Sequence, residues 1–169
     1  MQAIIFMKTG IYKYRGKEEN IIVQIKDEKK GIKELIPNKS LGIFILGSSI
    51  KKYVHLPHDL AKNEEKYFSY DSYNFYELGL IVWVEKGKVE TVCCKNECYW
   101  RGYNLLKMPI DKFQSLYNVM PDKSEKIYHL VNGRGQNQMV YDFDKLGLQI
   151  WVWRKKIVTV LVSNYEACD

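Results

Sequence analysis

The residues of this chain that could hold a metal ion are few. His55, His58 and Asp59 lie close together near the end of a short apolar stretch, and three such groups can act as ligands. Pro57 stands between the two histidines and breaks the helical spacing that would bring them onto one face. We therefore expect no metal and no cofactor.

The cysteines offer a second kind of chemistry. Cys93, Cys94 and Cys98 crowd one short segment, while Cys168 lies near the last residue. Their spacing lacks the paired C-x2-C pattern of structural zinc sites, and no histidine is near. A cysteine–histidine nucleophile, such as Cys93 with His129, rests on composition alone. We predict that the cysteines are reduced, small and buried apolar residues.

The remaining catalytic motifs are also missing from the sequence. The segment GRGQNQ, residues 133–138, has the glycines of a phosphate-binding loop but lacks the G-K-[ST] ending and a following helix. No G-x-S-x-G elbow occurs for a nucleophilic serine. The sequence therefore predicts a protein that is not an enzyme.

The strongest pattern in the sequence is an internal repeat. LGLIVWVEKGKVETV, residues 78–92, returns 68 residues later as LGLQIWVWRKKIVTV, with eight of fifteen positions identical. Upstream, residues 40–56 match residues 100–116 at a spacing of 60. The second copy must therefore hold eight extra residues, and VNGRGQNQ, residues 131–138, has that length and the composition of a loop.

Local patterns predict one helix and three strands in each copy. Pro109–Met120 has apolar residues at helical spacing and predicts an amphipathic helix of about three turns. Residues 48–56 predict a shorter helix that Pro57 stops. A strand is expected within 66–71 and within 137–143, and each precedes one of the repeated hairpins.

The predicted fold class is α+β, with two tandem helix-plus-antiparallel-sheet units that form one curved sheet with helices on one face, plus N-terminal strands. Residues 1–39 hold the N-terminal strands and a polar connection, residues 40–96 form repeat unit 1, and residues 97–169 form repeat unit 2. All three parts are expected to make one compact domain.

The repeated strands carry aliphatic side chains on one face and tryptophans on the other, because side chains alternate along a strand. The aliphatic face is expected to pack under the helices. The tryptophan face could be a second core layer or an exposed binding surface, and we favour binding because tryptophan and arginine are enriched at interfaces. The predicted partner-binding residues are Tyr76, Ile81, Trp83, Arg134, Gln149, Trp151 and Trp153.

A family resemblance follows from this order of pieces. A Gly-initiated segment, an apolar helix, a strand LGL-x-x-WV and a hairpin ending V-x-T-V resemble the tandem unit of β-lactamase inhibitor proteins and their small lipoprotein relatives, over about residues 36–163. The resemblance implies a curved sheet whose concave aromatic side holds a partner protein. It matches Tyr76, Trp83, Trp151 and Trp153 to that side, with residues 131–138 at its rim.

Charge and composition bear on the kind of partner. The chain has a formal charge of +6, without an export leader or an apolar run long enough to span a membrane, so we expect a cytoplasmic protein with no membrane partner. By type it is similar to bacterial immunity proteins that neutralise a toxin from neighbouring cells, as in contact-dependent growth inhibition. The sequence favours a protein-binding inhibitor of one cognate toxin domain. The alternative is a single-stranded nucleic-acid-binding module that uses basic and aromatic residues.

Overall fold

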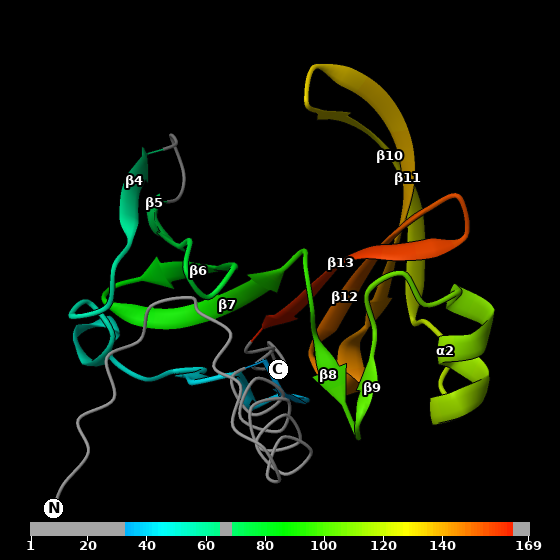
Figure 1. Ribbon diagram of the computed structural model, residues 1–169, viewed down its shortest axis with the longest axis horizontal. Coiled ribbons are helices and arrows are strands. Elements are labelled where there is room, and N and C mark those ends of the chain that lie inside the picture. The colour runs from blue at the N-terminus through cyan, green and yellow to red at the C-terminus, as the bar shows by residue number, and fades with distance from the viewer. Residues whose placement is uncertain (1–32, 65–68, 164–169) are drawn as a thin grey trace, which may run out of the picture.

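The fold is mostly β-structure (Figure 1). The computed structural model describes residues 33–64 and 69–163, so the strands expected within residues 1–32 lie outside the described residues. The first half contains β1 (Leu35–Ile36), β2 (Ser40–Leu41), β3 (Phe44–Ile45), the 3₁₀ helix η1 (Ile50–Lys52), β4 (Asp59–Glu64), β5 (Ser69–Phe75), β6 (Leu80–Glu85) and β7 (Lys88–Cys94). The second half contains β8 (Tyr99–Trp100), β9 (Tyr103–Asn104), helix α2 (Ile110–Tyr117), β10 (Lys123–Val131), β11 (Arg134–Phe143), the 3₁₀ helix η2 (Asp144–Leu146), β12 (Leu148–Trp153) and β13 (Lys156–Ser163).

A sheet of eight antiparallel strands dominates the molecule. Its order is β10-β11-β12-β13-β7-β6-β5-β4, so each half supplies four consecutive strands joined as a meander. The two meanders meet where β7 pairs with β13, and we call this pairing the seam. In Figure 1 the β4–β5 hairpin stands at one end of the sheet and the longer β10–β11 hairpin arches up at the other.

The seam has a local twofold symmetry that follows from the repeat. The spacing of 68 makes Leu161 the equivalent of Cys93, and these two residues are paired directly across the seam. On either side of them, Val92 pairs with Val162 and Cys94 pairs with Val160. Val160 is the equivalent of Val92 and Val162 is the equivalent of Cys94, so these two pairs are the same contact with the two halves exchanged. A twofold axis through the Cys93–Leu161 pair therefore relates the two meanders and keeps equivalent residues on the same face of the sheet.

The repeat also extends to the way each hairpin is held. In both halves three backbone hydrogen bonds tie the hairpin turn to the segment before the first helical turn, at equivalent positions. In the first half they are Gly47 N to Val89 O (2.7 Å), Val89 N to Ser48 O (2.9 Å) and Ile50 N to Gly87 O (3.0 Å). In the second half they are Lys107 N to Ile157 O (2.8 Å), Ile157 N to Met108 O (2.9 Å) and Ile110 N to Lys155 O (3.0 Å).

The hydrophobic core lies on one face of the large sheet. Burial alternates along β6 and β12, and the buried positions are the aliphatic residues. Their side chains point into the core, where they pack between the sheet and the elements that cover it. The small β1-β2-β3 sheet, η1, the β8–β9 hairpin and α2 supply the opposing side chains. Among these, Phe44 lies 4.6 Å from Phe75 between ring centroids, and Trp100 stacks on Tyr117 at 4.0 Å.

The predicted α+β class with two helix-plus-sheet units is wrong. Residues 48–56 form only the three-residue turn η1, where Ser49 caps Lys51 N at 3.4 Å and Val54 is 42% exposed. Two buried residues, Ile50 and Tyr53, give too short an apolar stripe to hold a longer helix. Helix α2 is the only α-helix among the described residues, and it ends at Tyr117, where the C-cap residue Asn118 adopts a left-handed conformation with φ of 52°.

The expected loop at residues 131–138 is also wrong. Val131 pairs with Arg134 around a two-residue turn, and the residues after it continue β11. Asn132 and Gly133 both have positive φ, 50° and 73°, which is the geometry of a type I′ hairpin turn and explains the Asn-Gly sequence. Only part of the extra length lies in this hairpin. Asp59 pairs with Asn74 and its counterpart Lys123 pairs with Asp142, so residues 59–75 correspond to residues 123–143 and the second hairpin is four residues longer. The other four extra residues precede β10.

The core placement can be tested with two adjacent residues. Phe44→Ala should lower the free energy of unfolding by about 3–5 kcal/mol, because Phe44 is 0% exposed and its loss leaves a cavity. Ile45→Ala should change it by less than about 1 kcal/mol, because Ile45 is 46% exposed. Urea denaturation of both variants measures the difference, and equal losses would contradict this account of the core.

Candidate functional site

The face of the large sheet opposite the core carries three of the four tryptophans, and we call it the tryptophan face. Trp83 comes from β6, and Trp151 and Trp153 come from β12. They alternate with the core residues of the same strands, and all three are partly exposed. Trp83 and Trp151 are repeat equivalents, so the twofold axis at the seam places one on each side of it.

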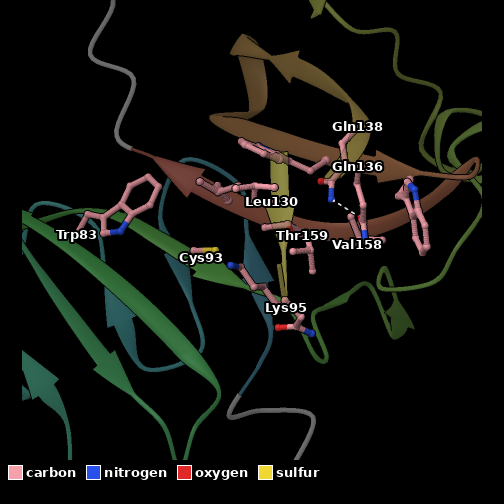
Figure 2. A pocket seen from close by; sticks show the side chains of 13 residues that line it. Trp83, Cys93, Lys95, Leu130, Gln136, Gln138, Val158 and Thr159 are labelled. Carbon is pink, nitrogen blue, oxygen red and sulfur yellow. Dashed lines mark hydrogen bonds between the residues drawn. The ribbon is translucent and has the colours of Figure 1, made fainter. Parts of the chain in front are cut away.

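A cavity of about 540 Å³ opens on the tryptophan face (Figure 2). Its lining includes all three tryptophans and, from the sheet between them, Cys93 and Leu161. Those two are only 4% and 5% exposed, so the middle of the seam forms a closed apolar base. A cavity of this size, mainly apolar with a few polar groups, is typical of ligand-binding sites.

The β10–β11 hairpin supplies one wall of this cavity. Leu130 comes from the end of β10, and four of residues 131–138 also line the cavity, namely Val131, Asn132, Gln136 and Gln138. The arch of the hairpin in Figure 1 brings its tip over the sheet. Leu130 is 63% exposed at that tip. Among the described residues, the corresponding β4–β5 hairpin of the first copy contributes none to the lining of this cavity.

Hydrogen bonds hold the polar side chains of the tryptophan face in place. Trp151 donates from Nε1 to Oε1 of Gln149 at 2.8 Å, and Gln149 donates from Nε2 to Oδ1 of Asp142 at 2.9 Å. On the hairpin wall, Gln138 donates from Nε2 to Oε1 of Gln136 at 3.0 Å. The chain of bonds from Asp142 fixes the orientation of the Trp151 indole, so this part of the surface is preorganised.

The other two tryptophans have aromatic or cationic neighbours. The guanidinium carbon of Arg154 lies 4.4 Å from the ring centroid of Trp153, which is within the range of a cation–π interaction. Tyr70 lies 6.0 Å from Trp83 between ring centroids in a tilted arrangement. Each indole therefore presents part of its surface to the cavity while another part is covered.

The structure brings together some of the predicted site residues and separates others. Trp83, Trp151 and Trp153 line one cavity. Ile81 and Gln149 share their face, because they pair with Cys93 and Leu161 in the sheet. Tyr76 lies in the turn after β5 and is 53% exposed, and Arg134 is exposed at the hairpin tip; neither lines the cavity.

Several residues that line the cavity were not predicted from the sequence. Cys93 was expected only as a buried residue, and Leu161 was not singled out in the sequence. Alternate positions counted from Trp83 through its strand partner Thr91 place Cys93 on the tryptophan face. Lys95, which follows β7, also lines the cavity. Gln138 was not predicted as a site residue because residues 131–138 were expected to form a loop, and no sequence pattern singled out Leu130.

The thiol of Cys93 is a poor nucleophile. Burial raises its pKa to about 11, and the neighbouring Lys95 opposes this shift only in part. Burial also raises the pKa of Cys94 and Cys98. The side chain of His129, the base considered for Cys93, lies outside the described part of the chain. A thiol that stays protonated at neutral pH does not support nucleophilic catalysis.

The described residues do not form a metal site. Within 33–64 and 69–163, no group of three or more His, Cys, Asp or Glu side chains lies close enough to hold an ion. Nδ1 of His58 instead donates a hydrogen bond to the carbonyl oxygen of Leu56 at 2.8 Å. Its ring packs 5.3 Å from those of Tyr73 and Phe75.

Comparison with family models, with curated proteins and with solved structures finds no match to this chain. Its function therefore has to be argued from the site itself. No helix in the part of the chain that the structure describes is long and apolar enough to cross a membrane.

The reactivity of Cys93 tests the description of the cavity base. With a pKa of about 11 in place of the ordinary 9.0, its thiolate fraction near neutral pH is roughly a hundredfold smaller. Iodoacetamide should therefore alkylate Cys93 in the folded protein at least about a hundredfold more slowly than in urea-unfolded protein. Peptide mass spectrometry over time measures both rates, and similar rates would mean that the thiol is accessible and ionised.

The same shift predicts a pH dependence of stability. A raised folded pKa means that the unfolded chain loses the proton first, so the stabilising contribution is fully present below about pH 9 and is lost as the pH rises toward about 11. The free energy of unfolding should fall over this range. In Cys93→Ala the fall should be shallower, and an unchanged slope in that variant would contradict the assignment to Cys93.

Proposed function

We propose that this chain is a non-enzymatic inhibitor that binds one partner protein through the tryptophan face. The most specific form of the proposal is an immunity protein that neutralises a cognate bacterial toxin domain by direct binding. The observation that carries it is the cavity lined by Trp83, Trp151 and Trp153 on a broad, eight-stranded sheet.

Partly exposed tryptophans support a binding role because leaving their apolar surface in water has a free-energy cost that a partner removes. Trp is among the residues most enriched at binding hot spots, where a few anchors supply most of the affinity. The Trp151 indole is already fixed by its bond to Gln149, so little conformational entropy is lost on binding. The wide sheet around the cavity gives a partner additional surface to contact.

The charge of the cavity favours a protein over a nucleic acid. A single-stranded nucleic-acid site combines stacking aromatics with several cations that follow the phosphates. Lys95 is the one lysine or arginine that lines this cavity among the described residues, and the nearby Arg154 lies against Trp153. A protein segment needs no such row of cations.

The proposal can be tested in cells with the product of the neighbouring gene. If that product contains a toxic domain, its expression should arrest growth, and co-expression of this chain should restore it. The purified pair should then form a 1:1 complex whose affinity changes little with salt, whereas nucleic-acid binding would weaken steeply as salt rises. Growth arrest that this chain fails to relieve would contradict the immunity role.

The partner surface can be mapped with variants that leave the fold intact. Leu130→Ser should weaken partner binding about tenfold or more, because Leu130 is exposed at the tip and lines the cavity. Its matched control is Met120→Ser, at a residue 78% exposed that does not line the cavity, which should leave affinity unchanged. Calorimetry measures affinity and thermal melting checks folding. Equal affinity in both variants would exclude the hairpin tip from the interface.

Trp151→Ala should have the larger effect, at least about 2 kcal/mol of binding free energy or roughly thirtyfold in affinity. Trp151 is partly buried and bonded to Gln149, so some loss of stability is also expected. Affinity is therefore measured well below the melting temperature of the variant. Wild-type affinity in the folded fraction would remove the tryptophan face from the proposed function.

A further inference from the structure

The hairpin wall contains a pair of amide side chains whose hydrogen bonding is incomplete. Gln138 is only 4% exposed, and its Nε2 donates to Oε1 of Gln136 at 3.0 Å. This is the only side-chain hydrogen bond of either residue in the described part of the chain. One carbonyl oxygen, on Gln138, and one amide nitrogen, on Gln136, are therefore not paired within the described residues.

These two atoms have access to the cavity. Every fully buried side-chain nitrogen or oxygen in the described ranges has a hydrogen-bond partner, so the unpaired oxygen of Gln138 must keep some contact with open space. Both glutamines line the cavity, and Figure 2 shows them one above the other on its wall. The wall thus offers one acceptor and one donor side by side, which is the complement of a single peptide group.

The rest of the cavity sets the other requirements on an occupant. The lining of the cavity also includes the indoles of Trp83 and Trp151, with Leu161 at the base. Lys95 is the single lysine or arginine of the lining within the described residues, and no aspartate or glutamate lines it. Burying an unpaired charge is costly, so this cavity suits an uncharged group with apolar bulk and one hydrogen-bonding edge.

We infer that the occupant is a segment of the partner's main chain that carries a bulky apolar side chain. The side chain enters between Trp83 and Trp151, and the adjacent peptide group bonds to Gln136 and Gln138. This inference rests on the proposed function and adds the chemistry by which the partner is recognised.

The amide pair belongs to the second half alone. Repeat equivalence pairs Gln138 with Tyr70, because Met139 lies opposite Val152 as Asp71 lies opposite Val84. Tyr70 is an aromatic residue near Trp83 and has no amide. The peptide-binding edge therefore depends on a residue that differs between the two copies, and the inferred site lies to one side of the twofold axis.

The experiment uses small probes in place of the partner. N-acetyl-phenylalaninamide supplies an aromatic side chain with two peptide groups, and ethylbenzene supplies the aromatic group without them. Both are titrated into the ¹⁵N-labelled full chain while the four indole N–H resonances are followed. The amide probe should shift Trp83 and Trp151 and leave Trp100, which is 7% exposed in the core, unmoved.

The variants separate the hydrogen bond from the apolar contact. Gln138→Leu should weaken binding of the amide probe about fivefold, the usual effect of losing an uncharged hydrogen bond, and leave ethylbenzene binding unchanged. Gln136→Leu, at a more exposed position, should act in the same direction and serves if the first variant is unstable. The matched control is Gln114→Leu on α2, which should change neither probe.

The possible failures are distinguishable. The inference is overturned if the amide probe leaves Trp83 and Trp151 unmoved, if ethylbenzene binds as tightly as the amide probe, or if both hairpin variants keep wild-type probe affinity. A stronger shift of the same indoles by a ten-residue oligothymidine would overturn it in favour of nucleic acid. If the partner complex depends on Trp151 but not on Gln138, the proposed function stands and this inference falls. If Trp151→Ala leaves partner affinity unchanged, the proposed function is contradicted, whatever the result with the small probes.

Discussion

The four residue pairs between β7 and β13 are the constraint on which the rest of the structure depends. They join two four-stranded meanders into one sheet. Their register also places the tryptophan-bearing faces of both meanders on the same side of that sheet. The side-chain hydrogen bond of 2.9 Å between Thr91 and Ser163 reinforces the end of this seam. Because strands have a side-chain period of two, a slip of one residue at the seam would turn one half over and send its tryptophan into the core.

The seam also explains what doubling achieves. A single meander would expose its last strand as an edge, and exposed edges invite uncontrolled pairing with other chains. Here the last strands of the two meanders cover each other. The seam places the small or medium-sized side chains of Cys93 and Leu161 at the base of the cavity, with a tryptophan on each side. Neither meander has this apolar base with two aromatic sides by itself, so the cavity is a property of the pair.

The sequence predicted the parts that depend on local periodicity. The alternation along β6 and β12 places the aliphatic residues in the core and the tryptophans opposite them. It failed where tertiary contacts decide. The strand β4, with the sequence DLAKNE, has no apolar alternation and is held by pairing with β5, while residues 48–56 have helical spacing but too few buried contacts. The site was incomplete because the seam register and the path of the β10–β11 hairpin are long-range features that no local pattern encodes.

The turns show one way in which the two copies differ. Both hairpins use a type I′ turn with two residues at positive φ, Lys86 and Gly87 in the first copy and Arg154 and Lys155 in the second. Lysine in the left-handed region costs about 1 kcal/mol where glycine is free of strain. In the second copy Lys155 stands at the position of Gly87. The neighbouring Arg154 has its guanidinium carbon 4.4 Å from the ring centroid of Trp153, a tryptophan that the first copy lacks. The added strain and the added cation–π contact are of similar size, so the second copy gains a third tryptophan at the cavity with little net change in the stability of its turn.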